Sequence, residues 1–198
     1  STFKNIAATN CPSSAVLVYP THVESGDVDN IELDHIWSVL GAGIVFKTNS
    51  SIARGNITDG TITNCQLTSG DENRVDSYPI YLQASAGKQI FGLKFNRIFT
   101  KVTDNNHIVI NPNGGSVYGN TFDLFTGETW KLGSTSPAYD VNKECLFVLD
   151  GQFFNNSFSN FYTTGMQGQG IILGDGSVGN TFDGLVLNDM SSLGVNNK

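Results

Sequence analysis

Acidic and aromatic side chains gather in two stretches of this 198-residue chain, residues 71–78 and 128–143. The first stretch contains Asp76, and the second contains Glu128 and Asp140. Two carboxyl groups that flank a glycosidic bond can hydrolyse it when they lie about 5–5.5 Å apart (retention) or about 6.5–9.5 Å apart (inversion). If the fold brings the two stretches together, Asp76 with Glu128 or Asp140 is a candidate catalytic pair at the wider spacing.

The same region of the sequence contains side chains that suit a sugar ligand. Trp130 and Tyr139 can stack on sugar rings, which present apolar faces. Arg74 in the first stretch and Asp104 between the two are further candidate substrate-binding residues. The alternative is that the charged residues are only solvated, as is usual in long loops.

A second candidate pair is Glu32 with Asp34. Two residues apart on one strand, they share a face at about 6.6 Å, which lies inside the inverting range. Lys4 is expected one repeat before Asp34, so a surface ion pair is the alternative interpretation.

The elements that must position these residues follow from a repeated string. Gly-Asn-Thr-Phe-Asp occurs at residues 119–123 and 179–183, and Asn-Asn-Ser-Phe-Ser occurs at 155–159. An alignment on the apolar residue of these strings gives seven repeats, with these anchors: Phe3, Leu33, Ile62, Phe95, Phe122, Phe158 and Phe182. Another apolar residue precedes each later anchor by four or five positions: Val28, Ile57, Ile90, Val117, Phe153 and Val178. A short apolar strand follows each of the first six anchors, at 15–19, 43–46, 80–82, 108–110, 146–149 and 171–173.

These repeats predict an all-β protein. Short strands alternate with Gly, Asn, Asp and Ser turns, and no ten-residue stretch has helical periodicity. One such unit cannot bury its apolar side alone, but seven stacked units can. We therefore predict a right-handed, single-stranded parallel β-helix of about seven coils, one domain over residues 1–198 and a fragment of a longer chain. A β-sandwich is the alternative, although two-residue Asn-Gly hairpin turns between alternating runs are missing.

The alternation of strand residues assigns the sides of the coils. Next to each inward anchor lies a polar residue that should face solvent, as Asp123 does beside Phe122. Asn120, Asn156 and Asn180 recur two residues before their anchors, where stacked amides can hydrogen bond from coil to coil. The second strands are apolar on their outer side as well: Val45, Tyr81, Val109, Phe147 and Ile172. An exposed apolar column needs cover, from loops of the same chain or, as we predict, from a partner subunit.

The alignment of the repeats also shows which of them contain insertions. From anchor to the next inward strand residue there are 11 residues after Leu33, but 18 after Ile62 and 24 after Phe122. Both insertions fall in the same turn and should project from one edge, with the short repeat of Phe95 between them. That arrangement predicts a groove about 10 Å wide, enough for one sugar chain, with Lys101, Asp104 and His107 on its floor.

Composition excludes several other classes of function. The net charge is −7 and the Lys and Arg residues are scattered, which argues against nucleic acid and against an anionic membrane surface. No apolar run approaches the roughly 20 residues of a membrane span. Three cysteines (Cys11, Cys65 and Cys145) lack metal-ligand spacing and are expected to be buried thiols. We expect no metal and no cofactor.

The Gly-Asn-Thr-Phe-Asp and Asn-Asn-Ser-Phe-Ser coils, with their variable turns and outward apolar column, resemble the parallel β-helix of bacteriophage tailspikes, within the pectate-lyase-like superfamily. The resemblance covers essentially the whole chain. It implies a homotrimeric virion protein of the phage tail that acts extracellularly and binds host surface polysaccharide. Such proteins often cleave the polysaccharide with a pair of carboxylates, so glycoside hydrolysis is the implied reaction. The calcium-Asp and Arg pattern of a pectate lyase is missing, so lyase chemistry is not implied. The alternative is a non-catalytic structural or adhesin segment that only binds glycans.

Overall fold

The computed structural model describes residues 1–9, 14–20, 26–39, 43–48, 55–69, 78–103, 105–130, 145–165, 169–187 and 192–197. All regular secondary structure in these residues is β-strand, and the two sheets that they form are built from parallel pairs. None of the described residues belongs to a helix long and apolar enough to cross a membrane. The all-β class is confirmed, and the arrangement fits a parallel β-helix.

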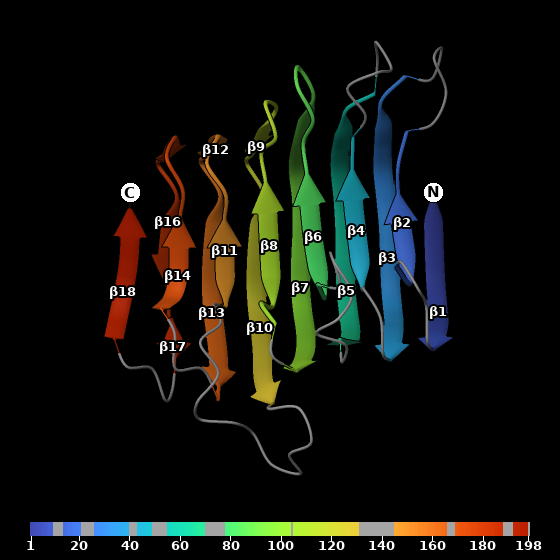
Figure 1. Ribbon diagram of the computed structural model, residues 1–198. Coiled ribbons are helices and arrows are strands. Elements are labelled where there is room, and N and C mark those ends of the chain that lie inside the picture. Colours follow the sequence, from blue (N-terminus) through green and yellow to red (C-terminus); the bar gives the residue numbers. More distant parts are fainter. Residues whose placement is uncertain are drawn as a thin grey trace.

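The first sheet contains the long strands of successive repeats, in the order β1 (Thr2–Thr9), β3 (Val28–Val39), β5 (Ile57–Ser69), β7 (Gln89–Thr103), β10 (Thr121–Trp130), β13 (Ser157–Thr164) and β16 (Thr181–Asp183). Four short strands extend it: β9 (Ser116–Tyr118), β12 (Gln152–Phe154), β15 (Ser177–Val178) and β17 (Val186–Leu187). The second sheet contains β2 (Val16–Val18), β4 (Ile44–Lys47), β6 (Ile80–Gln83), β8 (Ile108–Asn111), β11 (Leu146–Val148), β14 (Gln169–Leu173) and β18 (Ser192–Asn197). The two sheets lie one behind the other, with their strands running in opposite directions (Figure 1).

The register of the first sheet confirms the anchors that the sequence predicts. Each anchor pairs with the anchor of the next repeat, from Phe3 with Leu33 through to Phe158 with Phe182. Val178 does not face the core as the apolar residues that precede most other anchors do. Val178 precedes its anchor by four residues where the others precede theirs by five, so it faces outward, 66% exposed, and Ser177 pairs with Phe153 instead.

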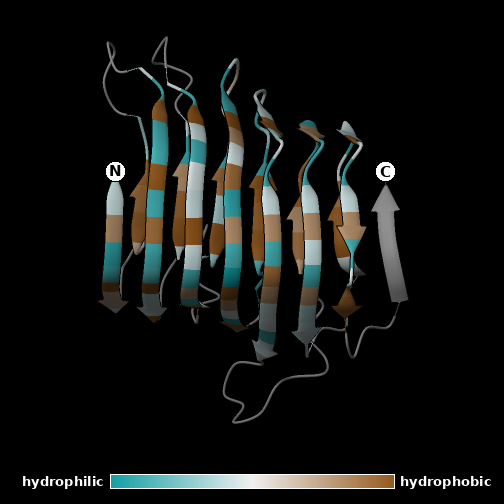
Figure 2. Ribbon diagram, turned by 180° about the vertical axis from the view of Figure 1, so that it is seen from behind, coloured by the Kyte–Doolittle hydropathy of each residue, from teal (hydrophilic) through white to brown (hydrophobic). Residues whose placement is uncertain are grey.

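The core lies between the two sheets and is built from these anchors. The rings of Phe95, Phe122, Phe158 and Phe182 stack in sequence, with centroids 4.4, 4.8 and 5.0 Å apart. From the second sheet, Phe46 meets Phe95 edge-on at 6.0 Å. Along the strands of the first sheet, hydrophobic residues alternate with hydrophilic ones (Figure 2). This alternation is what allows one side of each strand to be buried while the other meets water.

The long strands bend at two columns of residues with left-handed backbone, which the sequence analysis did not predict. The first corner column contains Asn30, Asp59, Gly92, Gly119, Asn155 and Gly179. The second corner column contains Asn5, His35, Asn64, Arg97, Leu124, Asn160 and Gly184. Asn, Asp and Gly adopt this conformation more easily than other residues, which explains most of both columns. The bends let one strand pass around the core without losing register with its neighbours.

Between the two corner columns lies an outward surface that we call the polar face. It consists of two columns of side chains: Thr2, Glu32, Thr61, Lys94, Thr121, Ser157 and Thr181, and Lys4, Asp34, Thr63, Asn96, Asp123, Ser159 and Asp183. None of these side chains is buried, so the predicted polar, solvated column is confirmed.

The predicted asparagine ladder is confirmed. The Nδ2 of Asn120 donates to the Oδ1 of Asn156 at 3.0 Å, and the Nδ2 of Asn156 donates to the Oδ1 of Asn180 at 2.9 Å. Asn120 and Asn156 are buried. Because buried amides are costly without partners, this ladder fixes the stacking of the last three repeats that it joins.

The outer apolar column of the second sheet is largely covered within the single chain. Val45, Tyr81 and Val109 are buried, and Phe147 packs against them, whereas Leu17 at the end of the column is 53% exposed. The partner subunit stays a prediction, and among the described residues only part of this column is left exposed for it to cover. Of the expected buried thiols, Cys65 and Cys145 are buried, and Cys11 lies outside the described residues.

Candidate functional site

The predicted groove between the two insertions lies mostly outside the part of the chain that the structure describes. Asp76, Asp140, Tyr139, Arg74 and Asp104 all belong to residues that are not described. Their assignment to a catalytic or sugar-binding site therefore stays a prediction.

Two members of the predicted site lie in a strand. Glu128 and Trp130 belong to β10, where the sequence analysis assigned them to the insertion. The half-buried Glu128 pairs in register with Lys101 of β7 and Thr164 of β13. The backbone of Trp130 pairs with that of Thr103, so the strand extends to residue 130.

The prediction that His107 lies on a groove floor is wrong. Its ring is fully buried, with Nδ1 2.7 Å from the hydroxyl of Thr100 and Nε2 3.0 Å from that of Thr129. Gly127 makes room for it, because a Cβ there would lie 2.9 Å from His107 Cε1. Burial lowers the pKa of His107 to about 3, so the neutral ring is a core side chain.

Glu32 and Asp34 both face outward on the polar face, as predicted, but their partners differ from the expected ones. Lys4 pairs in register with Asp34, yet its ammonium forms an ion pair with Glu32 at 2.9 Å. The side chains of Thr63 and Asn64 donate to the Asp34 carboxylate at 2.9 Å, and His35 lies 2.9 Å from it.

These contacts keep both carboxyl groups ionised. Hydrogen bonds from Asn64, His35 and Thr63 lower the pKa of Asp34 to about 2, and the hydrogen bond from Lys4 lowers the pKa of Glu32. A general acid for glycoside hydrolysis needs a raised pKa instead. The geometry therefore favours a binding or structural role for this pair over acid catalysis.

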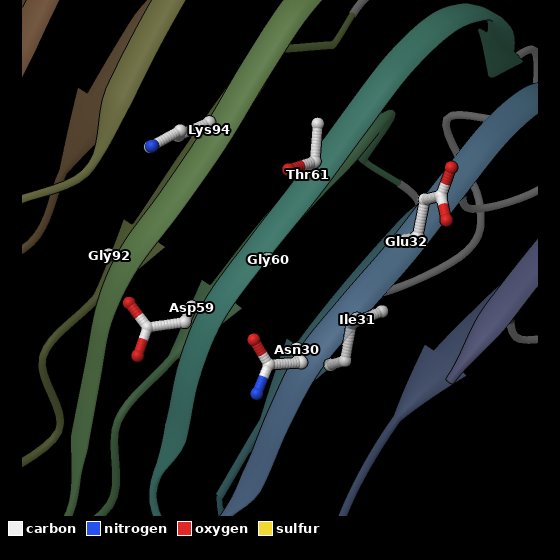
Figure 3. Close-up of a pocket in the computed structure, with 8 residues that line it drawn as sticks. All are labelled: Asn30, Ile31, Glu32, Asp59, Gly60, Thr61, Gly92 and Lys94. Atoms are coloured by element: carbon white, nitrogen blue, oxygen red, sulfur yellow. The ribbon is translucent and has the colours of Figure 1, made fainter.

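A surface hollow of about 360 Å³ opens beside Glu32, across strands β3, β5 and β7. Its polar lining comes from the first corner column and the polar face: Asn30, Glu32, Asp59, Thr61 and Lys94 (Figure 3). The volume is near the lower end of the range of about 300–1,000 Å³ that is usual for small-molecule sites.

Two glycines on adjacent strands, Gly60 and Gly92, also line the hollow. A Cβ at Gly60 would lie 2.9 Å from the side chain of Leu93, which is buried, so Gly60 contributes backbone to the lining. At Gly92, which has a φ of +71°, a Cβ would lie 2.5 Å from an oxygen of Asp59. The Asp59 carboxylate therefore extends over the glycine of the next repeat, as its stick in Figure 3 shows.

The charges around the hollow differ in how they are satisfied. Glu32 is paired with Lys4 and also accepts from Thr2 at 2.9 Å. By contrast, the carboxylate of Asp59 and the ammonium of Lys94 have no hydrogen bond or ion pair within the described ranges. Asn30, Asp59 and Lys94 were not among the predicted site residues, and no motif in the sequence links them.

Among the described residues there is no group of three His, Cys, Asp or Glu side chains that could hold a metal ion. Comparison with known proteins adds no assignment: no family model, no curated protein and no solved structure matches this chain. A function for it must be argued from the fold and from the hollow on the polar face.

Proposed function

We propose that this chain is the receptor-binding part of a bacteriophage tailspike, which binds host surface polysaccharide as a homotrimer on the virion. In this proposal the fold is a right-handed parallel β-helix of about seven coils. A right-handed coil is proposed because crossover connections between parallel strands of one sheet are nearly always right-handed. The in-register pairing of one repeat with the next supports the helix, because each repeat then contributes at least one strand to the first sheet and one strand to the second.

The observation that carries a binding function is the hollow on the polar face. Sugar recognition needs several hydrogen-bond donors and acceptors converging on a concave surface. Asn30, Thr61 and Lys94 offer donors there, and Asp59 and Glu32 offer acceptors. This combination is more typical of a hydroxyl-rich ligand than of an apolar one.

Cleavage of the polysaccharide is a second step of the proposal and depends on Asp76, Glu128 and Asp140. The low pKa values of Glu32 and Asp34 make the polar face itself a poor source of a general acid. A glycan-binding segment without hydrolytic activity is therefore the second candidate function.

Incubation with purified capsule or O-antigen from a panel of bacterial strains tests these proposals. Retention of the protein on immobilised polysaccharide measures binding, and size-exclusion chromatography of the glycan measures chain length. Saturable binding with unchanged chain length supports the binding segment, and shortened chains support the hydrolase. If no polysaccharide of the panel is retained, the proposed function is wrong. Light scattering tests the homotrimer separately, since a stable monomer would contradict it.

A further inference from the structure

We propose that the hollow binds one neutral sugar residue, with the Asp59 carboxylate accepting hydrogen bonds from two adjacent hydroxyl groups and Asn30 and Lys94 donating to sugar oxygens. This inference rests on the proposed glycan-binding function and specifies its ligand and residues.

Asp59 differs from Asp34 and Asp123 on the same surface in having no partner from the described part of the chain. In the second corner column, the amides of Asn64 and Asn160 donate to the carboxylates of Asp34 and Asp123, at 2.9 and 2.8 Å. These acidic groups are thus satisfied by the protein. The Asp59 carboxylate is exposed and has no such donor in the described part of the chain.

An ionised carboxylate can only accept hydrogen bonds, so a partner for Asp59 must be a donor. The two oxygens of one carboxylate can accept from two neighbouring groups at once. Adjacent ring hydroxyls of a sugar present two donors side by side, which matches this requirement. Asn30 lies one strand before Asp59 and extends its side chain in the same direction (Figure 3), so its amide can donate to the same ligand.

The charges around the hollow argue for a neutral ligand. Asp59 and Glu32 both line it, and the net charge of the chain is −7. The carboxylate of an acidic sugar would be placed near the Asp59 carboxylate, which has no partner among the described residues, and near Glu32, whose charge is already paired with Lys4. Neutral hydroxyl groups can use Lys94 and Asn30 as donors without that repulsion. The volume of about 360 Å³ suits a short ligand more than an extended chain.

The substitution Asp59→Asn gives a sharp test. Asn adopts positive φ readily, and the φ of Asp59 is 49°, so the variant should keep the fold. It keeps the size of the side chain but removes its charge and turns one acceptor into a donor. Asp175→Asn is the matched control, because Asp175 is an exposed carboxylate in the turn between β14 and β15. A second test variant is Lys94→Gln, and its control is Lys47→Gln, at the exposed end of β4.

The probes are the methyl glycosides of glucose, galactose, mannose and rhamnose, compared with those of glucuronic and galacturonic acid, titrated by ligand-observed NMR. We expect at least one neutral glycoside to bind, with Kd raised about tenfold or more by Asp59→Asn and by Lys94→Gln and unchanged by either control. The uronic acid glycosides should bind more weakly than the neutral ones.

The inference is overturned if Asp59→Asn binds as tightly as Asp175→Asn, if uronic acid glycosides bind as well as neutral ones, or if no neutral glycoside binds. Retention of the wild-type protein on whole polysaccharide distinguishes the two proposals. If retention persists in Asp59→Asn, glycan binding stands and only its assignment to the hollow fails. If the wild-type protein is not retained, the proposed function fails as well.

Discussion

Truncation of Asn156 to alanine is expected to be among the most destabilising single changes in the chain. The Oδ1 of Asn156 accepts from the backbone N and the Nδ2 of Asn120, both at 3.0 Å. Its Nδ2 donates to the Oδ1 of Asn180 at 2.9 Å and to the carbonyl of Phe154 at 3.1 Å. All of this is lost in Asn156→Ala, while Asn120 stays fully buried.

The magnitude follows mainly from the backbone N–H of Asn120, which loses its acceptor, whereas the Nδ2 of Asn120 keeps a bond to the carbonyl of Ile90 at 3.4 Å. A buried polar group without a partner costs about 1–3 kcal/mol, so we expect a loss of about that size in free energy of unfolding. That is a large fraction of the roughly 5–15 kcal/mol typical of a whole domain. Urea unfolding followed by circular dichroism measures the change, as a lower midpoint at an unchanged m value.

Two further variants separate the ladder from a simple loss of side-chain volume. Asn156→Asp keeps the shape but points a buried carboxylate oxygen at carbonyl oxygens. We therefore expect strong destabilisation at pH 7 that lessens in acid, where the protonated carboxyl becomes a donor. Asn155→Asp is the control, since Asn155 is exposed and its φ of 54° tolerates Asp. The reasoning is refuted if Asn156→Ala loses less than about 1 kcal/mol, or no more than Asn155→Asp.

Three other changes test the corners and the core. Leu124 has a φ of 54°, a strained conformation for Leu, and its side chain is 44% exposed. Leu124→Asn should therefore raise the unfolding free energy by about 1 kcal/mol in urea titrations. A lower unfolding free energy in this variant would contradict the strain. Gly127→Ala places a Cβ 2.9 Å from His107 and should cost about 1–3 kcal/mol, whereas Gly26→Ala, with nothing within 4 Å, should change the midpoint little; equal effects would refute the packing argument. The pKa of His107 is about 3 in the folded protein and near 6.5 when unfolded, so the unfolded state gains the proton first. Its contribution to stability is complete above pH 6.5 and is lost as pH falls toward 3, by about 1.4 kcal/mol per pH unit. Urea unfolding at pH 7 and pH 5 measures how much unfolding free energy is lost between the two pH values. The loss should be smaller in His107→Gln than in the wild type or in the control His35→Gln, and an equal loss would rule out His107 as the cause.

The register of the repeats could be predicted because each repeat contributes inward residues that must stack on those of the next. A shift by one residue would expose every anchor, so the alignment of Phe95, Phe122 and Phe158 was strongly specified. The asparagine ladder followed from the same alignment. Val178, an apolar residue one position out of step with the other repeats, faces the opposite side.

The corner columns could be predicted only in part. Asn64 and Asn160 carry the usual preference for left-handed backbone, but Leu124 and Arg97 do not, and they adopt it because their neighbours above and below are already bent. His107 also looked like a surface residue, because the sequence does not show that Gly127 leaves space for its ring.

The sequence by itself thus determined the all-β class, the spacing of the repeats and the inward and outward sides, because these depend on the alternation of residues within one strand and on its repetition. The tertiary structure decided which polar residues share a site. Asn30, Asp59 and Lys94 come from three repeats and meet only because stacking places their strands side by side. In the sequence of a single repeat, each of these is an ordinary polar residue. Only the assembled sheet brings them together and leaves the charges of Asp59 and Lys94 without a partner among the described residues.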